Sequence, residues 1–444
     1  MAHDRSSGTH ERFRPGRQLR AATFGHTLEW FDFLAYQYLA VYFAAQIFGG
    51  EEGIGSLLEA FGTFAVGFLA RPVGSLIIGV YADRYGRKPA VVMTMSMMAV
   101  GSLLLGLCPT YAQAGALAPV ILVVARLLQG FSAGGEYPSA SAFLIESAPP
   151  GRRGLFSSFM FVASSSSKLL TLGIIALLSL FLDKEQMYDF GWRVPFVLGA
   201  VLAVVGWWIR RNTSETADVA GINERSARPT LFAGLRRYPR YSLQLFFLVA
   251  AITGGQYFWG TYITTLFQIR NGASQQVAFV ASIVSLVVYI AVQPLVGSLS
   301  DRFGRRPWLI VFCVGSGLVA VPLMSLSSPA VGVLITVQTV GLLFMAFGTS
   351  ILSAVMVEMF PAHARVAGLG FAYSMSVVVF GGTIPLIATA LQGAGHPMAI
   401  GWYLVALCVM SLVSVLTIRE TSTVDLQTGT GVSEAAAPDP SRPV

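Results

Sequence analysis

The chain has 444 residues, of which 54% are hydrophobic and only 11% are charged. A soluble domain carries about a quarter charged residues, so this composition excludes an ordinary soluble enzyme and indicates a protein surrounded largely by lipid. The net charge of +7 would suggest a nucleic-acid partner for a soluble protein, but in a membrane protein the placement of the charges matters more.

Residues 1–20 are polar and basic and precede an apolar stretch without a small-residue cleavage site, which predicts an uncleaved cytoplasmic leader. A bilayer core needs about 20 apolar residues as a helix. Such runs come in two sets of six, and the sequence therefore predicts an all-α membrane protein with twelve transmembrane helices. The runs cover approximately residues 21–48, 57–82, 89–108, 117–144, 155–182 and 192–209, and then 242–269, 275–299, 308–325, 330–356, 366–391 and 397–418.

The longest internal polar segment, residues 210–241, divides the chain into two six-helix bundles and is expected to be a cytoplasmic linker. The bundles extend over residues 21–209 and 242–418. Residues 419–444 are expected to form a disordered cytoplasmic tail.

Basic residues are distributed unevenly between the two sides of the predicted bundle. If the amino terminus is cytoplasmic, the leader, the linker, the tail and the cytoplasmic loops hold 23 of the 29 Lys and Arg residues. The opposite loops hold only Lys184 and Arg270. The positive-inside rule then places both termini in the cytoplasm.

The two halves repeat in sequence. GVYADRYGRK at 79–88 recurs as GSLSDRFGRR at 297–306, and ESAPPGRR at 146–153 matches EMFPAHAR at 358–365. Internal repeats around a midplane site are the usual architecture of secondary transporters, so the halves are expected to be pseudo-symmetric.

The repeated loops place a short cationic turn after an acid at the end of a span. Asp83 and Asp301 can pair with Arg87 and Arg305, or with helix ends in the same half; the alternative is simple positive-inside anchoring. The duplicated loops resemble the signature of the major facilitator superfamily. The resemblance implies the major facilitator fold and a charge relay that gates the cytoplasmic face. Its residues would be Asp83, Arg84, Arg87, Glu146, Arg153, Asp301, Arg302, Arg305, Glu358 and Arg365.

A narrower resemblance rests on EWFDF at 29–33, FLARPVG at 68–74, RLLQGFSAGGEY at 126–137 and GWRVPF at 191–196. Together these segments are similar to the metabolite:proton symporter family, over roughly residues 19–418, and most similar to its 2-oxoglutarate permeases. The family's substrates include 2-oxoglutarate, citrate, shikimate, proline and betaine.

Charges inside lipid-spanning helices are costly unless they meet a cavity or a partner, so each is a functional candidate. Glu29 and Asp32 share one helix face at i, i+3, and their repulsion and lost hydration favour proton uptake. With Glu136 they are the proton-coupling candidates. The alternative for Glu29 and Asp32 is a structural pair that a basic residue neutralises.

Three cations are candidates for binding an anion. Arg126 stays charged and needs a carboxylate from the protein or from a substrate, while GFSAG at 130–134 supplies small residues for close helix packing. Lys168 follows four serines and suits a carboxylate ligand, or else pairs with Glu136. Arg71 is also a candidate, although a structural or gating role is favoured for it. A helix tie to an acid is the alternative for Arg126.

The second half lacks deep charges, and Gln338 occupies the position that corresponds to Arg126. Gln256, Tyr257 and Gln293 are its candidate substrate contacts, with packing as the alternative for each. No phosphate-binding loop, metal-ligand cluster or nucleophile elbow is present, so neither a cofactor nor a metal is expected.

The sequence therefore predicts a bacterial inner-membrane transporter, functional as a monomer, that imports a small organic acid with protons by alternating access. A di- or tricarboxylate such as 2-oxoglutarate is the favoured substrate. The alternatives are a zwitterionic osmolyte such as betaine or proline and, outside transport, a receptor or scaffold.

Overall fold

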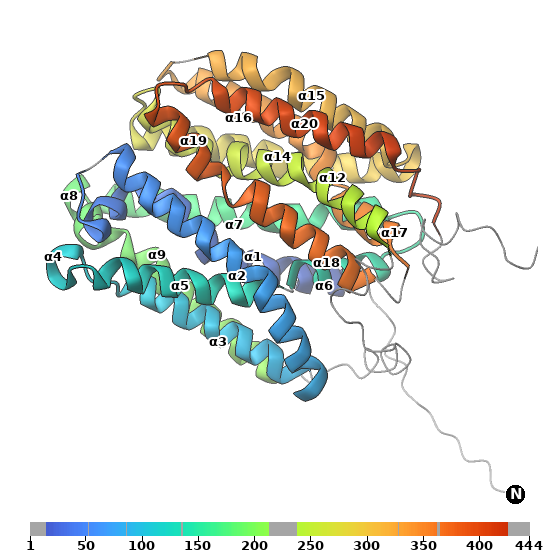
Figure 1. Cartoon of the computed structure of the whole chain (residues 1–444), viewed down its shortest axis with the longest axis horizontal. Coiled ribbons are helices and arrows are strands. Elements are labelled where there is room, and N and C mark those ends of the chain that lie inside the picture. The colour runs from blue at the N-terminus through green and yellow to red at the C-terminus, as the bar shows by residue number, and fades with distance from the viewer. Residues whose placement is uncertain are drawn as a thin grey trace, which may run out of the picture.

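The computed structural model describes residues 15–51, 53–85, 87–134, 136–212, 238–326, 328–361 and 365–424, and these ranges contain helices and no strands. The helices lie roughly along one common direction, with the first half of the chain on one side and the second half on the other (Figure 1). The first half contains α1 (Pro15–Phe48), α2 (Ile54–Tyr85), α3 (Arg87–Gly106), α4 (Tyr111–Ala114), α5 (Leu117–Ala133), α6 (Glu136–Glu146), α7 (Arg153–Phe181), α8 (Lys184–Gln186), the π-helical turn η1 (Met187–Gly191) and α9 (Arg193–Asn212).

The second half begins after the expected linker, most of which lies outside the described residues. Two of its long helices are interrupted by π-helical turns, η3 and η5, which are rare in proteins and frequent at functional sites. Its elements are α12 (Pro239–Tyr257), η3 (Phe258–Tyr262), α13 (Ile263–Ile269), α14 (Gln275–Phe303), α15 (Arg306–Ser325), α16 (Val331–Thr349), α17 (Leu352–Met359), α18 (Arg365–Ser376), η5 (Val377–Gly381), α19 (Ile384–Gly393) and α20 (Ala399–Thr417).

Each predicted apolar run falls on one of these helices or on consecutive ones. Within the described ranges, seven helices are long and apolar enough to cross a membrane, or up to eight if the bent pair 184–191 and 193–204 is one span. Several other runs are broken: α5 ends at Ala133 and α6 begins at Glu136. A multi-pass membrane protein is therefore confirmed, while the number twelve and the orientation of the termini stay predictions.

The outer surface of the bundle is apolar. Leu180, Leu318 and Leu107 keep 78%, 71% and 67% of their surface exposed, and many other large aliphatic side chains also point outward. Water-soluble proteins rarely expose apolar surface on this scale, which is what a lipid solvent requires.

Close packing of α2 against α5 fixes the core of the first half. A Cβ atom on Gly130 would collide with the carbonyl of Gly67, and one on Gly134 would collide with the carbonyl of Arg71. The predicted role of the small residues at 130–134 is therefore confirmed. This contact brings Arg126, one turn before Gly130, and Arg71 toward the same region of the bundle.

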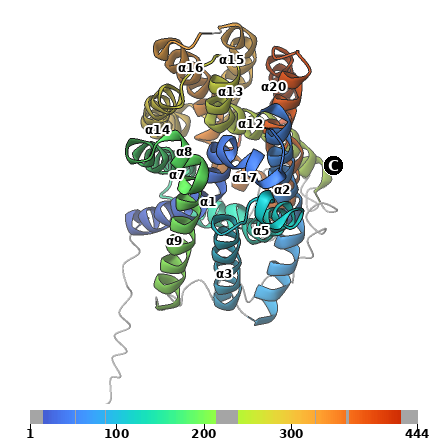
Figure 2. The same cartoon turned by 90° about the vertical axis from the view of Figure 1, so that its left-hand side faces the viewer.

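The two halves meet along α7 and α14 (Figure 2), and also along α2 and α19. The α7–α14 crossing is closest where a Cβ on Gly297 would lie 2.5 Å from the carbonyl oxygen of Gly154. We call this end, where α14 ends at Phe303 and α15 begins at Arg306, the motif end. At the opposite end, the ring of Phe61 on α2 contacts Tyr262 of η3 at 5.7 Å between centroids.

Candidate functional site

Arg126 is fully buried on α5, in the centre of the first half. Its Nη1 donates a hydrogen bond of 2.7 Å to Oε1 of Gln129, whose Nε2 donates to Ser102 on α3 at 3.0 Å. The guanidinium carbon lies 4.1 Å from the ring centroid of Tyr36 and 4.4 Å from that of Phe33. The faces of these aromatic rings attract the guanidinium and help to stabilise its charge in the buried position.

Arg71 on α2 is 5% exposed and lies against the same aromatic cluster. Its guanidinium carbon is 4.1 Å from the centroid of Phe68, 4.5 Å from Phe33 and 5.4 Å from Trp30. Within the described residues Arg71 forms no ion pair with an acid, and its Nε has no hydrogen-bond partner. Because Arg71 and Arg126 both contact the ring of Phe33, the two guanidinium groups are close neighbours.

Arg71 lines a pocket between the two halves. The wall from the second half is made of Tyr373, Ser374 and Val377, and the ring of Tyr373 stacks on Tyr137 of α6 at 4.5 Å. A largely apolar pocket with one charged group is the usual form of a small-molecule site. Its full lining is His26, Trp30, Phe33, Arg71, Met98, Ala133, Gly134, Tyr137, Pro138, Tyr373, Ser374 and Val377.

Lys168 is 2% exposed at the middle of α7. Its ammonium forms no ion pair and no hydrogen bond within the described part of the chain. It lies instead against Gly260 of η3, in the second half, where it occupies the space that a Cβ atom would need. The side chain of Glu136, the alternative partner predicted for Lys168, lies outside the described residues.

The three polar candidates from the second half differ in how their side chains are bonded. The amide of Gln293 is paired at both ends, with Thr349 at 2.9 Å and Ser350 at 2.7 Å, which is a structural arrangement. Gln256 accepts from Tyr289 at 3.1 Å, but its Nε2 has no partner among the described residues, and neither has the hydroxyl of Tyr257. Gln256 and Tyr257 are therefore available to a ligand, and Gln293 is not.

Gln338, the counterpart of Arg126, is buried and fully bonded. Its Nε2 donates to the carbonyl of Trp259 at 3.0 Å, and its Oε1 accepts from Ser282 at 2.9 Å. The second repeat thus uses the position as a neutral tie between helices.

The three proton-coupling candidates lie on helices whose backbone is described. Glu29 and Asp32 belong to α1, and Glu136 is the first residue of α6. Their side chains lie outside the described residues, so these predictions stay untested. His26, one turn before Glu29, is buried and packs at 5.7 Å from Trp30 and 5.8 Å from Tyr137.

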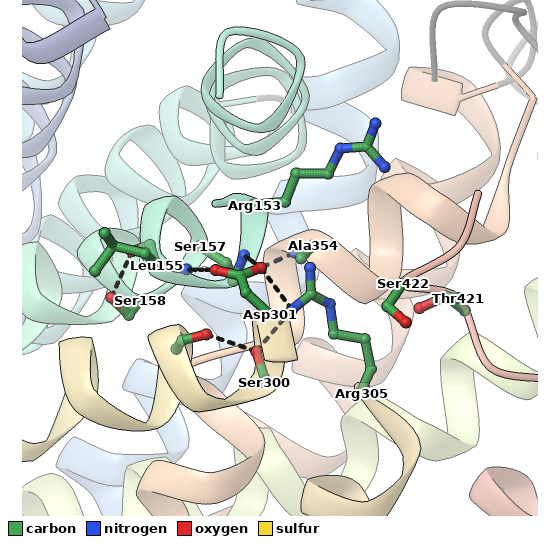
Figure 3. Close-up of polar contacts among 12 residues, drawn as sticks. Arg153, Leu155, Ser157, Ser158, Ser300, Asp301, Arg305, Ala354, Thr421 and Ser422 are labelled. Carbon is green, nitrogen blue, oxygen red and sulfur yellow. Dashed lines mark hydrogen bonds and ion pairs between the residues drawn. The ribbon is translucent and has the colours of Figure 1, made fainter. Parts of the chain in front are cut away.

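At the motif end, Asp301 connects the two halves directly (Figure 3). Its carboxylate accepts hydrogen bonds from the backbone N–H groups of Gly154 at 2.7 Å and Leu155 at 3.0 Å, at the amino terminus of α7. Free N–H groups and the helix dipole make such a terminus a good site for an anion. The helix end that Asp301 caps belongs to the other half, whereas the sequence suggested a helix end in its own half.

Arg305 and Glu358 form the buried centre of this network. Nη1 of Arg305 donates to Asp301 at 2.9 Å, and its Nη2 lies 3.4 Å from Glu358, which is completely buried. Burial lowers the pKa of Arg305, but the charges of Glu358 and Asp301 outweigh this effect and raise it above its usual value. Arg153, from the first half, lies 3.9 Å from Glu358. The predicted partners Arg153, Asp301, Arg305 and Glu358 therefore do meet.

The residues after α20 extend this network. We call Ile418–Val424 the strap. Within it, Glu420 accepts from the backbone N–H groups of Arg305 at 2.8 Å and Arg306 at 3.0 Å, and Thr421 donates to Glu358 at 2.7 Å. Arg153 donates to the carbonyl of Val424 at 2.6 Å. Residues 419–424, expected to belong to a disordered tail, are thus bound to both halves.

Burial raises the pKa of Glu420, but the backbone N–H groups of Arg305, Ser422 and Arg306 outweigh it and hold the pKa below its ordinary value. The carboxylate is therefore ionised where it caps the amino terminus of α15.

The six remaining gating candidates do not belong to the buried network at the motif end as far as the structure describes it. Arg302 is exposed, and Glu146 is exposed at the end of α6. The side chains of Asp83, Arg84, Arg87 and Arg365 lie outside the described residues, so the first repeat of the gate stays a prediction.

Sequence reasoning missed three contributors to these sites. The aromatic residues Trp30, Phe33 and Phe68 lie within the segments EWFDF and FLARPVG, but they were not proposed as site residues, because aromatic residues in spans usually serve packing. The strap was missed because Glu420 and Thr421 belong to the segment that was expected to be a disordered tail. Gly260 could have been found only by knowing that the side chain of Lys168, on α7, reaches η3.

The described residues contain no cluster of three or more His, Cys, Asp or Glu side chains that could hold a metal ion. Cys108, Cys313 and Cys408 are buried and unbridged, as is usual for cysteines that serve as small packing residues. What the described site offers a ligand is therefore charge, hydrogen-bond donors and aromatic surface.

Comparison with known proteins agrees with this architecture. The family model described as Major Facilitator Superfamily matches residues 22–375 and 263–438. The structure of the proton:xylose symporter XylE, bound to 6-bromo-6-deoxy-D-glucose, superposes with a TM-score of 0.72 at 16% identity, over 92% of this chain and 96% of XylE. This likeness concerns the fold alone.

Several curated proteins are similar over most of their length. The chain is 35% identical to the alpha-ketoglutarate permease of Escherichia coli K12, over 90% of this chain and 93% of the permease. It is 32% identical to the citrate-proton symporter of Klebsiella pneumoniae, over 94% of both chains. It is 30% identical to the proline/betaine transporter of Escherichia coli K12, over 91% of this chain and 84% of the transporter.

Proposed function

Because the chain belongs to the major facilitator superfamily, whose members similar to it are permeases and symporters and not enzymes, we propose that it carries a small organic acid across the membrane together with protons. A di- or tricarboxylate such as 2-oxoglutarate is the proposed substrate. The relatives named for alpha-ketoglutarate and citrate support this class.

The observation that carries the proposal is the presence of two buried cations near the boundary between the halves, without an acid partner among the described residues. Arg71 and Lys168 are 5% and 2% exposed, and neither forms an ion pair within the described residues. Removing a cation from water costs several kcal/mol unless an anion compensates, so buried cations without an acid partner favour an anionic ligand. Arg126, beside Arg71, adds a third positive charge.

For proton coupling we propose Glu29, Asp32 and Glu136, which lie on α1 and α6, whereas the cations lie on α2, α5 and α7. A carboxylate that pairs with Arg126 when ionised releases the arginine to a substrate when protonated, so proton and anion load together. We expect no cofactor, because the proton gradient supplies the driving force.

The motif end is the proposed cytoplasmic gate of an alternating-access cycle. In the present conformation it is closed, because Asp301, Arg153 and the strap bond the two halves together there. We place this end in the cytoplasm because the basic loops lie there, and the protein in a bacterial inner membrane as a functional monomer in lipid.

A zwitterionic osmolyte is the second candidate, because a proline/betaine transporter is 30% identical to the chain. An aromatic cluster could hold a quaternary ammonium group. Here, however, the guanidinium groups of Arg71 and Arg126 already lie over the faces of Phe33, Phe64 and Phe68, and they would repel such a cation.

Uptake into proteoliposomes tests the proposal. With an inward proton gradient, we expect accumulation of radiolabelled 2-oxoglutarate or citrate, and collapse of that accumulation when a protonophore is added. Accumulation that needs sodium and ignores the protonophore would overturn the proton assignment. Uptake of betaine or proline without any of the acids would overturn the substrate class.

A further inference from the structure

Lys168 and Gly260 meet across the boundary between the halves. The ammonium of Lys168, on α7, occupies the space beside the Cα of Gly260, so any larger residue there would collide with it. The carbonyl of Gly260 accepts a hydrogen bond of 3.0 Å from the hydroxyl of Tyr38 on α1. The π-helical turn η3 shifts the backbone bonding of its helix, and Gly260 thereby faces the first half with both its Cα and its carbonyl.

Gln256 adds a second free donor at the same place. Its Nε2 lies 3.6 Å from where a Cβ of Gly260 would stand, next to the ammonium of Lys168. Its Oε1 is held by the hydroxyl of Tyr289, which also bonds Thr349 at 2.8 Å, so the amide is fixed with Nε2 toward the lysine. Nε2 has no acceptor within the described residues.

An ammonium and an amide N–H₂ are both donors, and an ionised carboxylate is acceptor-only. Two buried donors side by side without an acceptor therefore suit one carboxylate, and the ammonium makes the bond charge-assisted. A zwitterion's cationic end is excluded from this position by repulsion.

The arginines form a separate group. Arg71 and Arg126 share the ring of Phe33 on α1, whereas Lys168 projects from α7 toward η3. Tyr257 connects the two groups, because it follows Gln256 in the chain and its ring lies 5.4 Å from Phe68, on which Arg71 rests.

We propose that Lys168 and Gln256 form a carboxylate subsite shared by both halves, which holds the far carboxylate of a dicarboxylic acid whose other carboxylate lies beside Arg71 and Arg126. The proposal rests on the proposed function and narrows its substrate to acids with a carboxylate at each end. Because the two donors belong to different halves, the carboxylate also ties α7 to η3 when the substrate is bound.

The first test compares two ligands by calorimetry on the purified full-length protein. The ligand 2-oxopentanoate matches 2-oxoglutarate except that a methyl group replaces the far carboxylate. Wild type should bind 2-oxoglutarate at least about 30-fold more tightly, the lower end of what a buried charge pair contributes. Lys168→Met should weaken the binding of 2-oxoglutarate until the two affinities lie within about threefold of each other. The affinity for 2-oxopentanoate should be unchanged.

The second test uses Gly260→Ala, which fills the subsite and displaces the ammonium. The same loss of preference for the diacid is expected. Gly173→Ala is the matched control, because Gly173 lies in the interior of α7 and a Cβ there meets nothing within 4 Å. In a Lys168→Ala background, which removes the colliding ammonium, Gly260→Ala should cause no further loss of affinity.

The outcomes separate the subsite from the proposed function. If wild type prefers 2-oxoglutarate and Lys168→Met keeps that preference, the subsite is overturned and organic-acid transport stands. If Lys168→Met weakens the binding of both acids equally, Lys168 does not bind the far carboxylate specifically, and this result also overturns the subsite. If wild type binds neither acid but binds betaine, both proposals fail.

Discussion

Replacing Asp301 by alanine should open the motif end. Asp301 makes three contacts in the closed state, but its bond to Arg305 lies within one half and survives opening. Only the bonds to the N–H groups of Gly154 and Leu155 cross between the halves. A hydrogen bond to a charged group contributes at least about 1.5 kcal/mol, so losing both shifts the equilibrium by about 3 kcal/mol, or roughly a hundredfold.

A cysteine at Ala354 reports this opening. Ala354 is fully buried on α17, and its backbone N–H bonds Ser157 of the first half at 3.1 Å. With the three native cysteines replaced by serine, the rate of labelling by N-ethylmaleimide follows the open population. Asp301→Ala should raise this rate roughly a hundredfold, or to the plateau at which the open state dominates. Asp301→Asn keeps one acceptor oxygen, so its labelling rate should lie between those of the wild type and Asp301→Ala.

Arg302→Gln is the matched control, since Arg302 is the exposed neighbour of Asp301 on α14 and the change also removes one charge. Labelling of the Asp301→Ala protein within twofold of wild type would refute the idea that the cap on α7 holds the motif end closed.

Three further predictions concern the binding site, the proton path and the strap. Arg126→Gln should weaken binding of a dicarboxylate by about 2–5 kcal/mol and Arg126→Lys by less; calorimetry that gives an affinity within twofold of wild type would make Arg126 a helix tie. Asp32→Asn should abolish uphill accumulation in proteoliposomes yet spare counterflow, and full accumulation would move coupling to Glu29 or Glu136. Because the pKa of Glu420 is lowered in the folded protein, its contribution to holding the strap is present at neutral pH and is lost as pH falls through that pKa. A nitroxide on Val424→Cys should therefore become mobile in wild type only in acid, as the pH falls through the lowered pKa of Glu420, but at neutral pH in Glu420→Gln; identical spectra for the two at pH 7 would contradict the assignment.

The helices were largely predictable because lipid demands long apolar runs, and such runs are visible in a single sequence. The run predicted at 275–299 is α14 (Gln275–Phe303), and the one at 155–182 is α7 (Arg153–Phe181). The interruptions were not predictable. Nothing in the residues of η3 or η5 distinguishes a π-helical turn from ordinary helix, because tertiary packing decides it.

The sequence predicted which residues form the gate, but it did not predict which contacts they make. Charged residues near the ends of spans identified Arg153, Asp301, Arg305 and Glu358, which do meet. Asp301 bonds the amino terminus of α7, which belongs to the opposite half. This contact depends on how α7 crosses α14, and a single sequence does not show that crossing. In the binding site, the cations stood out because buried charge is rare, whereas Gln293 was chosen only for its polarity and proves to be paired at both ends.

The strap has a consequence for how this protein can be tagged and truncated. A reporter fused directly to the end of α20 at Thr417 would replace Glu420 and Thr421, leaving the amino terminus of α15 uncapped and Glu358 short of a donor. Arg153 would lose the carbonyl of Val424 at the same time. A fluorescent protein or affinity tag placed after Val424 keeps these bonds, so the choice of fusion point alone would change which conformation a biochemist purifies.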